Sequence, residues 1–100
     1  MTAGSRGGRD LDELDRVFSA LAHHSRRTIL LVLHLRGGEM TSGEIAGRFD
    51  HSWPTITRHL RILEQAGLVH VTQRGREHVY RLDSGPLSDV GVNWLRRFND

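Results

Sequence analysis

The chain has no lysine and no cysteine among its 100 residues, so each of its 14 basic side chains is an arginine. Without cysteine it has no disulfide framework, no thiolate nucleophile and no cysteine-ligated zinc site. Long hydrophobic runs are missing too, because the longest aliphatic run, residues 29–33, is far too short to span a bilayer. We therefore expect no membrane partner and a cytoplasmic location.

Catalytic motifs are also missing. The sequence contains no nucleophile elbow, phosphate-binding loop, paired-carboxylate spacing or HExxH arrangement. We therefore expect no catalytic residue and no cofactor, and predict that the protein is not an enzyme. A chain of this length forms one domain. Residues 1–9 are rich in glycine and precede no hydrophobic segment, so we expect a disordered leader there and the domain over residues 10–100.

The positive charge is concentrated in one segment. Residues 1–50 hold seven arginines and seven carboxylates, which cancel. Residues 51–82 hold five arginines against two glutamates, an excess of +3, together with four histidines. An excess of this size raises nucleic-acid binding only slightly above background by itself. Its meaning depends on the structure that this segment forms.

Hydrophobic periodicity predicts two helices in the first part of the chain. The first starts at Asp10 behind an acidic cluster that suits the positive end of a helix dipole. His23 and His24 interrupt it, and we expect Ser25 to cap a second helix. This second helix is predicted to stop at Gly37 and Gly38.

Two further helices come in close succession. Residues 41–44 have the spacing of a capping box, which opens a short third helix. Ser52 is predicted to cap a fourth helix that ends at Gly67. The apolar side chains of the fourth helix share one face: Ile56, Leu60 and Leu63. The opposite face is basic and has no carboxylate: Pro54, Arg58, Arg61 and Gln65.

After Gly67 the helical period gives way to alternation. Residues 68–73 and 78–82 predict a two-stranded hairpin with a basic tip. Residues 84–86 then open a last helix. The order of four helices, two strands and one helix predicts a mainly α fold with a small β-hairpin, namely a winged helix-turn-helix. In this fold the third helix supports the fourth, which is the recognition helix.

Five segments stand in unbroken order: FSALA (18–22), SRRTIL (25–30), MTSGEIA (40–46), RHLRILEQAGLV (58–69) and GREHVYRL (75–82). Together they resemble the ArsR/SmtB family of bacterial transcriptional regulators. The resemblance covers about residues 12–98 and implies a winged helix-turn-helix homodimer that represses promoters by binding operator DNA. Many members sense metals through cysteines on the third helix or Asp and His pairs on the last one. This chain has neither.

The sequence is therefore closer to the autorepressor-like branch of the family, whose last helix carries a Trp and Phe pattern, as Trp94 and Phe98 do here. We expect no metal-binding residue, and the inducer stays undefined. Two alternatives remain within the family: a sensor of a small apolar ligand, or of a metal held by histidines between subunits. His23 and His24 are interpreted as a polar cap pair. A third alternative, a winged-helix module for protein or RNA, fits the basic face poorly.

The resemblance and the basic face together identify the expected DNA contacts. Thr55, Thr57 and Arg58 are the candidates for base edges, because Arg can pair with guanine and Thr can contact a thymine methyl. Arg61 and Gln65 lie further along and are expected at phosphates.

Three further positions complete this set. Ser52 is expected to offer its backbone amide to a phosphate. Arg74 and Arg76 at the hairpin tip are expected at a phosphate or in the minor groove. Trp53 is either a groove-contacting aromatic or a lid over the helix junction. His59, at the edge of the apolar face, is expected to be a packed, hydrogen-bonded histidine.

The apolar stripes of the first and last helices together form a larger apolar surface than the core of a domain of this size can cover. We therefore expect them to form the dimer interface across a two-fold axis. The alternative is that they pack only on their own domain. A dimer would present two recognition helices about 34 Å apart and hence predicts an inverted-repeat operator. The expected interface residues are Leu11, Leu14, Phe18, Leu87, Val90, Trp94 and Phe98.

Overall fold

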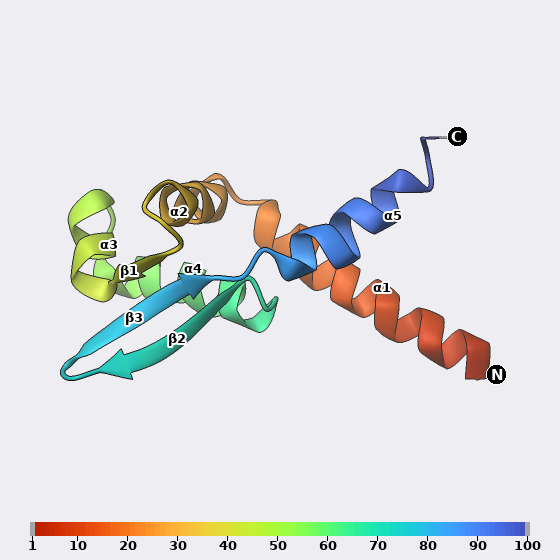
Figure 1. Ribbon diagram of the computed structural model, residues 1–100, viewed down its shortest axis with the longest axis horizontal. Helices are drawn as coiled ribbons and strands as arrows, with labels where there is room; N and C mark the ends of the chain where they lie inside the picture. The colour runs from red at the N-terminus through yellow and green to blue at the C-terminus, as the bar shows by residue number, and fades with distance from the viewer. Residues whose placement is uncertain (1, 100) are drawn as a thin grey trace.

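The molecule is elongated, and different helices and strands lie at its two ends (Figure 1). The computed structural model describes residues 2–99, with the side chains of residues 11–99, and measures 47 × 27 × 22 Å. Helix α1 (Thr2–Leu21) and the last helix lie together at one end, where both chain termini are found. The third helix and the tip of the hairpin lie at the other end.

Helix α1 begins earlier than the sequence predicted. It starts at Thr2, whereas we expected a disordered leader over residues 1–9 and a helix from Asp10. The glycines in this segment are weak helix formers. However, residues 2–9 contain no proline, so no residue lacks the amide that the helical ladder needs. The helix ends at Leu21, with one residue between it and the two histidines, as expected.

Helix α2 (His24–Leu35) is capped by His23 and not by Ser25. The Nδ1 atom of His23 accepts a hydrogen bond from the backbone N–H of Ser25 at 3.3 Å. A ring nitrogen can replace a hydroxyl oxygen in this role, because the cap only needs an acceptor on a residue with extended backbone. The predicted stop is confirmed: Gly37 and Gly38 come after the helix with φ of 90° and 101°, which favour glycine.

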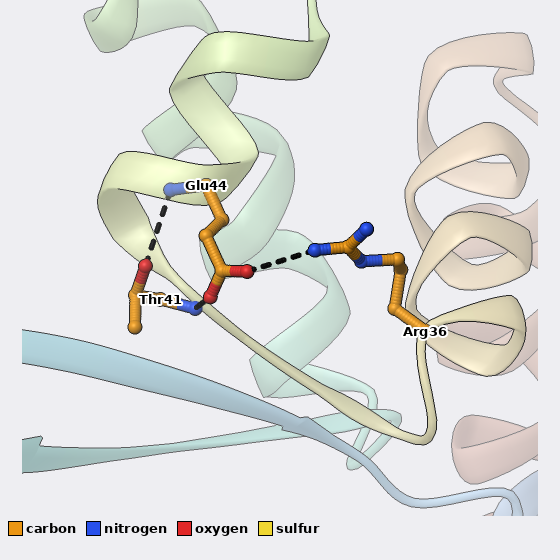
Figure 2. A network of polar contacts seen from close by, with 3 residues as sticks. All are labelled: Arg36, Thr41 and Glu44. Atoms are coloured by element: carbon orange, nitrogen blue, oxygen red, sulfur yellow. Dashed lines mark hydrogen bonds and ion pairs between the residues drawn. The ribbon is translucent and has the colours of Figure 1, made fainter.

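Helices α3 (Ser42–Arg48) and α4 (Trp53–Gln65) both start at the predicted caps. Thr41 and Glu44 form the complete capping box, and the Glu44 carboxylate also pairs with Arg36 at 3.0 Å (Figure 2). The pKa of Glu44 is lowered, first by the backbone N–H of Thr41 and then by Arg36. This network joins the end of α2 to the start of α3, the support helix.

The sheet has three antiparallel strands, one more than predicted. Strands β2 (Val69–Arg74) and β3 (Glu77–Leu82) form the expected hairpin, and β1 (Glu39–Thr41) pairs with the other edge of β3. Strand β1 is too short to show a period in the sequence and forms because its pairing partner is already in place. At the hairpin tip Gly75 has a φ of 64° and is followed by Arg76 in an ordinary conformation, as in a type II′ turn.

One apolar cluster unites α2, α4 and the sheet. Helix α4 contributes Ile56, Leu60 and Leu63, as predicted, and each is at most 1% exposed. The chain then passes into the last helix, a π-helical turn η1 (Leu87–Val92) followed by α5 (Asn93–Arg96). η1 packs on α1. The winged helix-turn-helix fold expected from the sequence is therefore confirmed, with β1 added.

The substitution Thr41→Ala removes the hydroxyl that caps α3. We expect the free energy of unfolding to fall by about 1 kcal/mol, the usual cost of an N-cap. Urea denaturation measures this. Arg36→Gln is the matched control, because it leaves the capping box intact and breaks only an exposed ion pair, which contributes little. Equal losses in both variants would contradict the assigned role of Thr41.

Candidate nucleic-acid interface

The outer face of α4 is exposed and basic. The helix packs on α1, α2 and β2 through its apolar side, which leaves the opposite side to solvent. Arg58, Arg61 and Gln65 are all exposed there, as the helical period predicted. The structure thus presents Arg58 and Arg61 on an accessible surface, while Gln65, at the end of the helix, lines a groove beside Arg16 of α1.

The first turn of α4 is held by its own hydroxyl groups. The Ser52 Oγ accepts a hydrogen bond from the Thr55 amide at 3.4 Å and lies 3.0 Å from the Thr55 Oγ1. The Thr57 Oγ1 donates to the Trp53 carbonyl at 2.7 Å. The Thr57 proton is therefore used within the helix, and its methyl group and lone pairs are the groups that remain for a base. Arg58 keeps its full donor set and is the stronger candidate for reading bases.

Trp53 stands at the start of the same helix with 39% of its surface exposed. A lid over the helix junction would be buried more deeply than this. The partial exposure favours the interpretation of Trp53 as an aromatic that a bound molecule can contact. His51, which the sequence analysis did not single out, is exposed one residue before the cap.

The wing carries two arginines near its tip, in different environments. Arg74 lies 3.4 Å from a carboxylate oxygen of Glu39 on β1, and both side chains are largely exposed. Exposed pairs of this kind are weak, so Arg74 can exchange Glu39 for a phosphate at little cost. Arg76 occupies the turn itself and is exposed. Gln73 donates to the Gly75 carbonyl at 3.3 Å and braces the turn.

The base of the wing is tied to the start of the last helix. His70 on β2 contacts the Asp83 carboxylate at 2.8 Å, and the other oxygen of Asp83 accepts from the Gly85 amide at 2.9 Å. These two hydrogen bonds, that of His70 first, lower the pKa of Asp83. A segment that the sequence analysis treated as a simple helix cap therefore also orients the wing.

His59 is the one buried polar side chain among the described residues, with 8% of its surface exposed. Its Nδ1 lies 3.2 Å from Nη1 of Arg26, and its ring centroid lies 4.6 Å from that of His23. Burial lowers the pKa of His59, and the nearby charges of His23, Arg26, His51 and Arg58 lower it further. The prediction of a packed, hydrogen-bonded histidine is confirmed.

The two terminal helices pack on each other within the chain. Leu14 is 6% exposed, and the Phe18 and Trp94 rings meet edge to face at 6.1 Å. Part of the stripe assigned to a partner, Leu14 above all, thus covers its own domain, as does Val17, which the sequence analysis did not include.

An apolar surface is still left uncovered at this end. Leu11 is 53% exposed and Phe98 is 68% exposed. Between the helices runs a groove of about 290 Å³, whose lining includes Leu11, Val90 and Trp94. Val92 and Leu95 are exposed as well and were missed, because the π-helical turn adds a residue and rotates the rest of the helix by about 100°.

Two properties of the described part of the chain bear on other functions. Residues 11–99, whose side chains the structure describes, contain no cluster of three or more His, Asp or Glu side chains placed to hold a metal ion. Over the same residues, no helix combines the length and apolar character needed to cross a membrane.

Comparison with known proteins places the chain among regulators. A family model described as a helix-turn-helix domain matches residues 21–72. The transcriptional repressor SdpR of Bacillus subtilis is 39% identical over 85 residues, which cover 85% of this chain and 91% of that protein. A crystal structure of an ArsR family transcriptional regulator superposes with a TM-score of 0.77 at 30% identity over 86% of each chain.

A solution structure from Mycobacterium bovis is described as a homodimeric winged helix-turn-helix DNA-binding domain and a possible ArsR-family regulator. It has a TM-score of 0.74 and 27% identity, and the match covers 92% of this chain and 84% of that one.

The lowered pKa of His59 makes stability depend on pH. In the unfolded chain this histidine binds a proton near pH 6.5, whereas the folded site resists protonation. The contribution to stability is therefore complete above pH 6.5 and is lost as the pH falls toward the folded pKa. We expect the free energy of unfolding, measured in urea between pH 8 and pH 5.5, to decrease more in the wild type than in His59→Asn. Parallel profiles would contradict this.

Proposed function

Since the chain belongs to the ArsR/SmtB family of winged helix-turn-helix transcriptional regulators, we propose that it is a homodimeric repressor that binds an inverted-repeat operator. The observation that carries the proposal is the exposed basic face of α4. Its apolar face is fully buried, so the helix is rigidly mounted with its arginines outward. A helix presented in this way fits the major groove of DNA.

The contacts divide into base reading and phosphate binding. Arg58, Thr55 and Thr57 on the first turns of α4 are proposed to meet base edges. Arg61, Gln65 and the Ser52 amide are proposed to meet phosphates, with Trp53 stacked beside the groove. Arg74 and Arg76 of the wing add flanking contacts.

The dimer is proposed to form through the uncovered apolar surface of the terminal helices. Leu11, Val92, Leu95 and Phe98 are exposed in the single chain. Aromatic side chains such as Phe98 are enriched at the centres of interfaces. Trp94 lines the adjoining groove, with Leu87 and Val90 on the same helix. A two-fold axis here leaves both α4 faces free, because the wing tip and α3 lie at the opposite end (Figure 1).

Arg58 on α4 and Arg76 on the wing are expected to affect DNA binding differently, Arg58 through base specificity and Arg76 through salt dependence. On the duplex that the protein protects upstream of its own coding region, Arg58→Ala should cost about 1–3 kcal/mol and relax specificity at one base pair. Arg76→Ala should weaken binding to all sequences and reduce the slope of log affinity against log salt by about 0.9 per operator contact. Fluorescence anisotropy over a salt series measures both.

Arg96→Ala is the matched control for this series, because it removes the same charge at the end of the molecule away from the wing. An unchanged salt slope in Arg76→Ala would exclude the wing contact. The same titration with zinc and with a chelator tests the alternative of a histidine-held metal between subunits. Equal binding under both conditions removes that alternative.

A charge at Phe98 should prevent dimer formation without unfolding the domain. The side chain is already 68% exposed in the single chain, so Phe98→Asp costs the fold little but places a carboxylate in the proposed interface. We expect a monomer at micromolar concentration by sedimentation, with an unchanged circular dichroism spectrum. Thr72→Asp, on an exposed position of β2, should remain dimeric. A wild-type monomer would refute the dimer outright.

A further inference from the structure

The side chain of Arg26 links the end of α1 to the recognition helix. Its Nε donates to the carbonyl of Ala20 and its Nη2 to that of Ser19, both at 2.9 Å. Its Nη1 lies 3.2 Å from Nδ1 of His59 on α4. One rigid planar group therefore contacts the last turn of α1 and the middle of α4 at the same time.

The His59 end of this link has a defined protonation state. A guanidinium group has donors only, so Nδ1 of His59 must accept, and the ring proton resides on Nε2. The same ring packs against His23, the N-cap of α2. The junction between α1 and α2 thus holds α4 through two neighbouring side chains.

The neighbouring Arg27 shows that Arg26 does more than cap a helix. Arg27 donates to the Leu21 carbonyl at 2.7 Å and so caps the same end of α1. Both arginines suit the negative end of the helix dipole. Within the described residues, however, only the Arg26 guanidinium also bonds to α4. The two side chains carry the same charge and lie on the same helix, but only that of Arg26 extends to α4.

We propose that Arg26 is a positioning residue for DNA recognition, which sets the orientation of α4 relative to α1 through its bond to His59. The proposal rests on the proposed function, since α1 then carries part of the dimer interface and α4 the reading face. Helix α4 has 13 residues and is about 20 Å long. A rotation of about 10° about its centre moves each end by roughly 2 Å, enough to break base contacts.

Protonation of His59 at low pH breaks its hydrogen bond with Arg26. The charged and titratable groups that act on the His59 ring are His23 and Arg26 from the α2 side and His51 and Arg58 from the α4 side, while α1 presents the carbonyls that Arg26 holds. All four of these side chains favour the neutral ring. A proton on Nδ1 would point at the Arg26 donor, so the hydrogen bond cannot survive protonation.

Lysine substitutions separate positioning from capping. Arg26→Lys keeps the charge but cannot form the fork to Ser19, Ala20 and His59 together. We expect operator affinity of the full chain, measured by anisotropy at pH 7.5, to fall about 2- to 30-fold, with the dimer and the folded circular dichroism spectrum retained at the assay temperature. The matched control, Arg27→Lys, should bind within about twofold of the wild type. Equal effects of the two variants would overturn the proposal.

Substitutions of His59 supply a second readout. His59→Asn places an oxygen acceptor near the position of Nδ1 but does not titrate, whereas His59→Leu packs without an acceptor. Between pH 7.5 and 5.5 we expect the affinity of the wild type to fall relative to His59→Asn. General protonation of surface histidines would strengthen DNA binding in both proteins, so it cannot produce this difference.

A double variant tests whether Arg26 acts through His59. If Arg26 acts through His59, then Arg26→Lys combined with His59→Leu should bind no more weakly than His59→Leu alone. Additive losses, or identical pH profiles for the wild type and His59→Asn, would overturn the inference. Failure of the wild type to bind any upstream duplex would instead refute the proposed function, so the two failures are distinguishable.

Discussion

The structure depends on the burial of one face of α4. Ile56, Leu60 and Leu63 are almost completely removed from water, and each such side chain contributes about 1.5–3 kcal/mol. Helices α1 and α2 and strand β2 supply the surfaces that cover them. Because a helix has a period of 3.6 residues, burying this face necessarily turns Arg58 and Arg61 outward. The stability of the core and the exposure of the basic face therefore have the same cause.

All basic side chains of this protein are arginines, and the fold depends on the geometry of the guanidinium group. Arginine has five donors in a rigid plane, and the fold uses that plane inside the molecule as well as on its surface. Arg26 reaches two carbonyls and one imidazole, and Arg27 caps the same helix end. The ammonium group of lysine has three donors on a single nitrogen, so it could not make the three contacts of Arg26 in one geometry.

Much of the architecture could be predicted from the sequence, because it depends on neighbours within about one helical turn. The capping box at Thr41, the cap at Ser52 and the hairpin turn at Gly75 are local signals, and each was found where expected. The errors also have physical causes. Strand β1 has no signal of its own, since its partner is β3, and a histidine took the capping role that a serine usually fills. The π-helical turn shifted which side chains of the last helix are exposed.

The sequence alone therefore determined the order of the helices and the hairpin, the inward and outward faces of α4 and the family, because periodicity, caps and motif spacing are properties of short segments. Only the tertiary structure decided which distant groups meet. Arg26 and His59 are 33 residues apart, and no pattern in either segment indicates their hydrogen bond. Likewise, only the packing of η1 on α1 shows that Leu14 is covered within the chain while Phe98 is not. Such contacts depend on how whole elements pack, which local sequence does not encode.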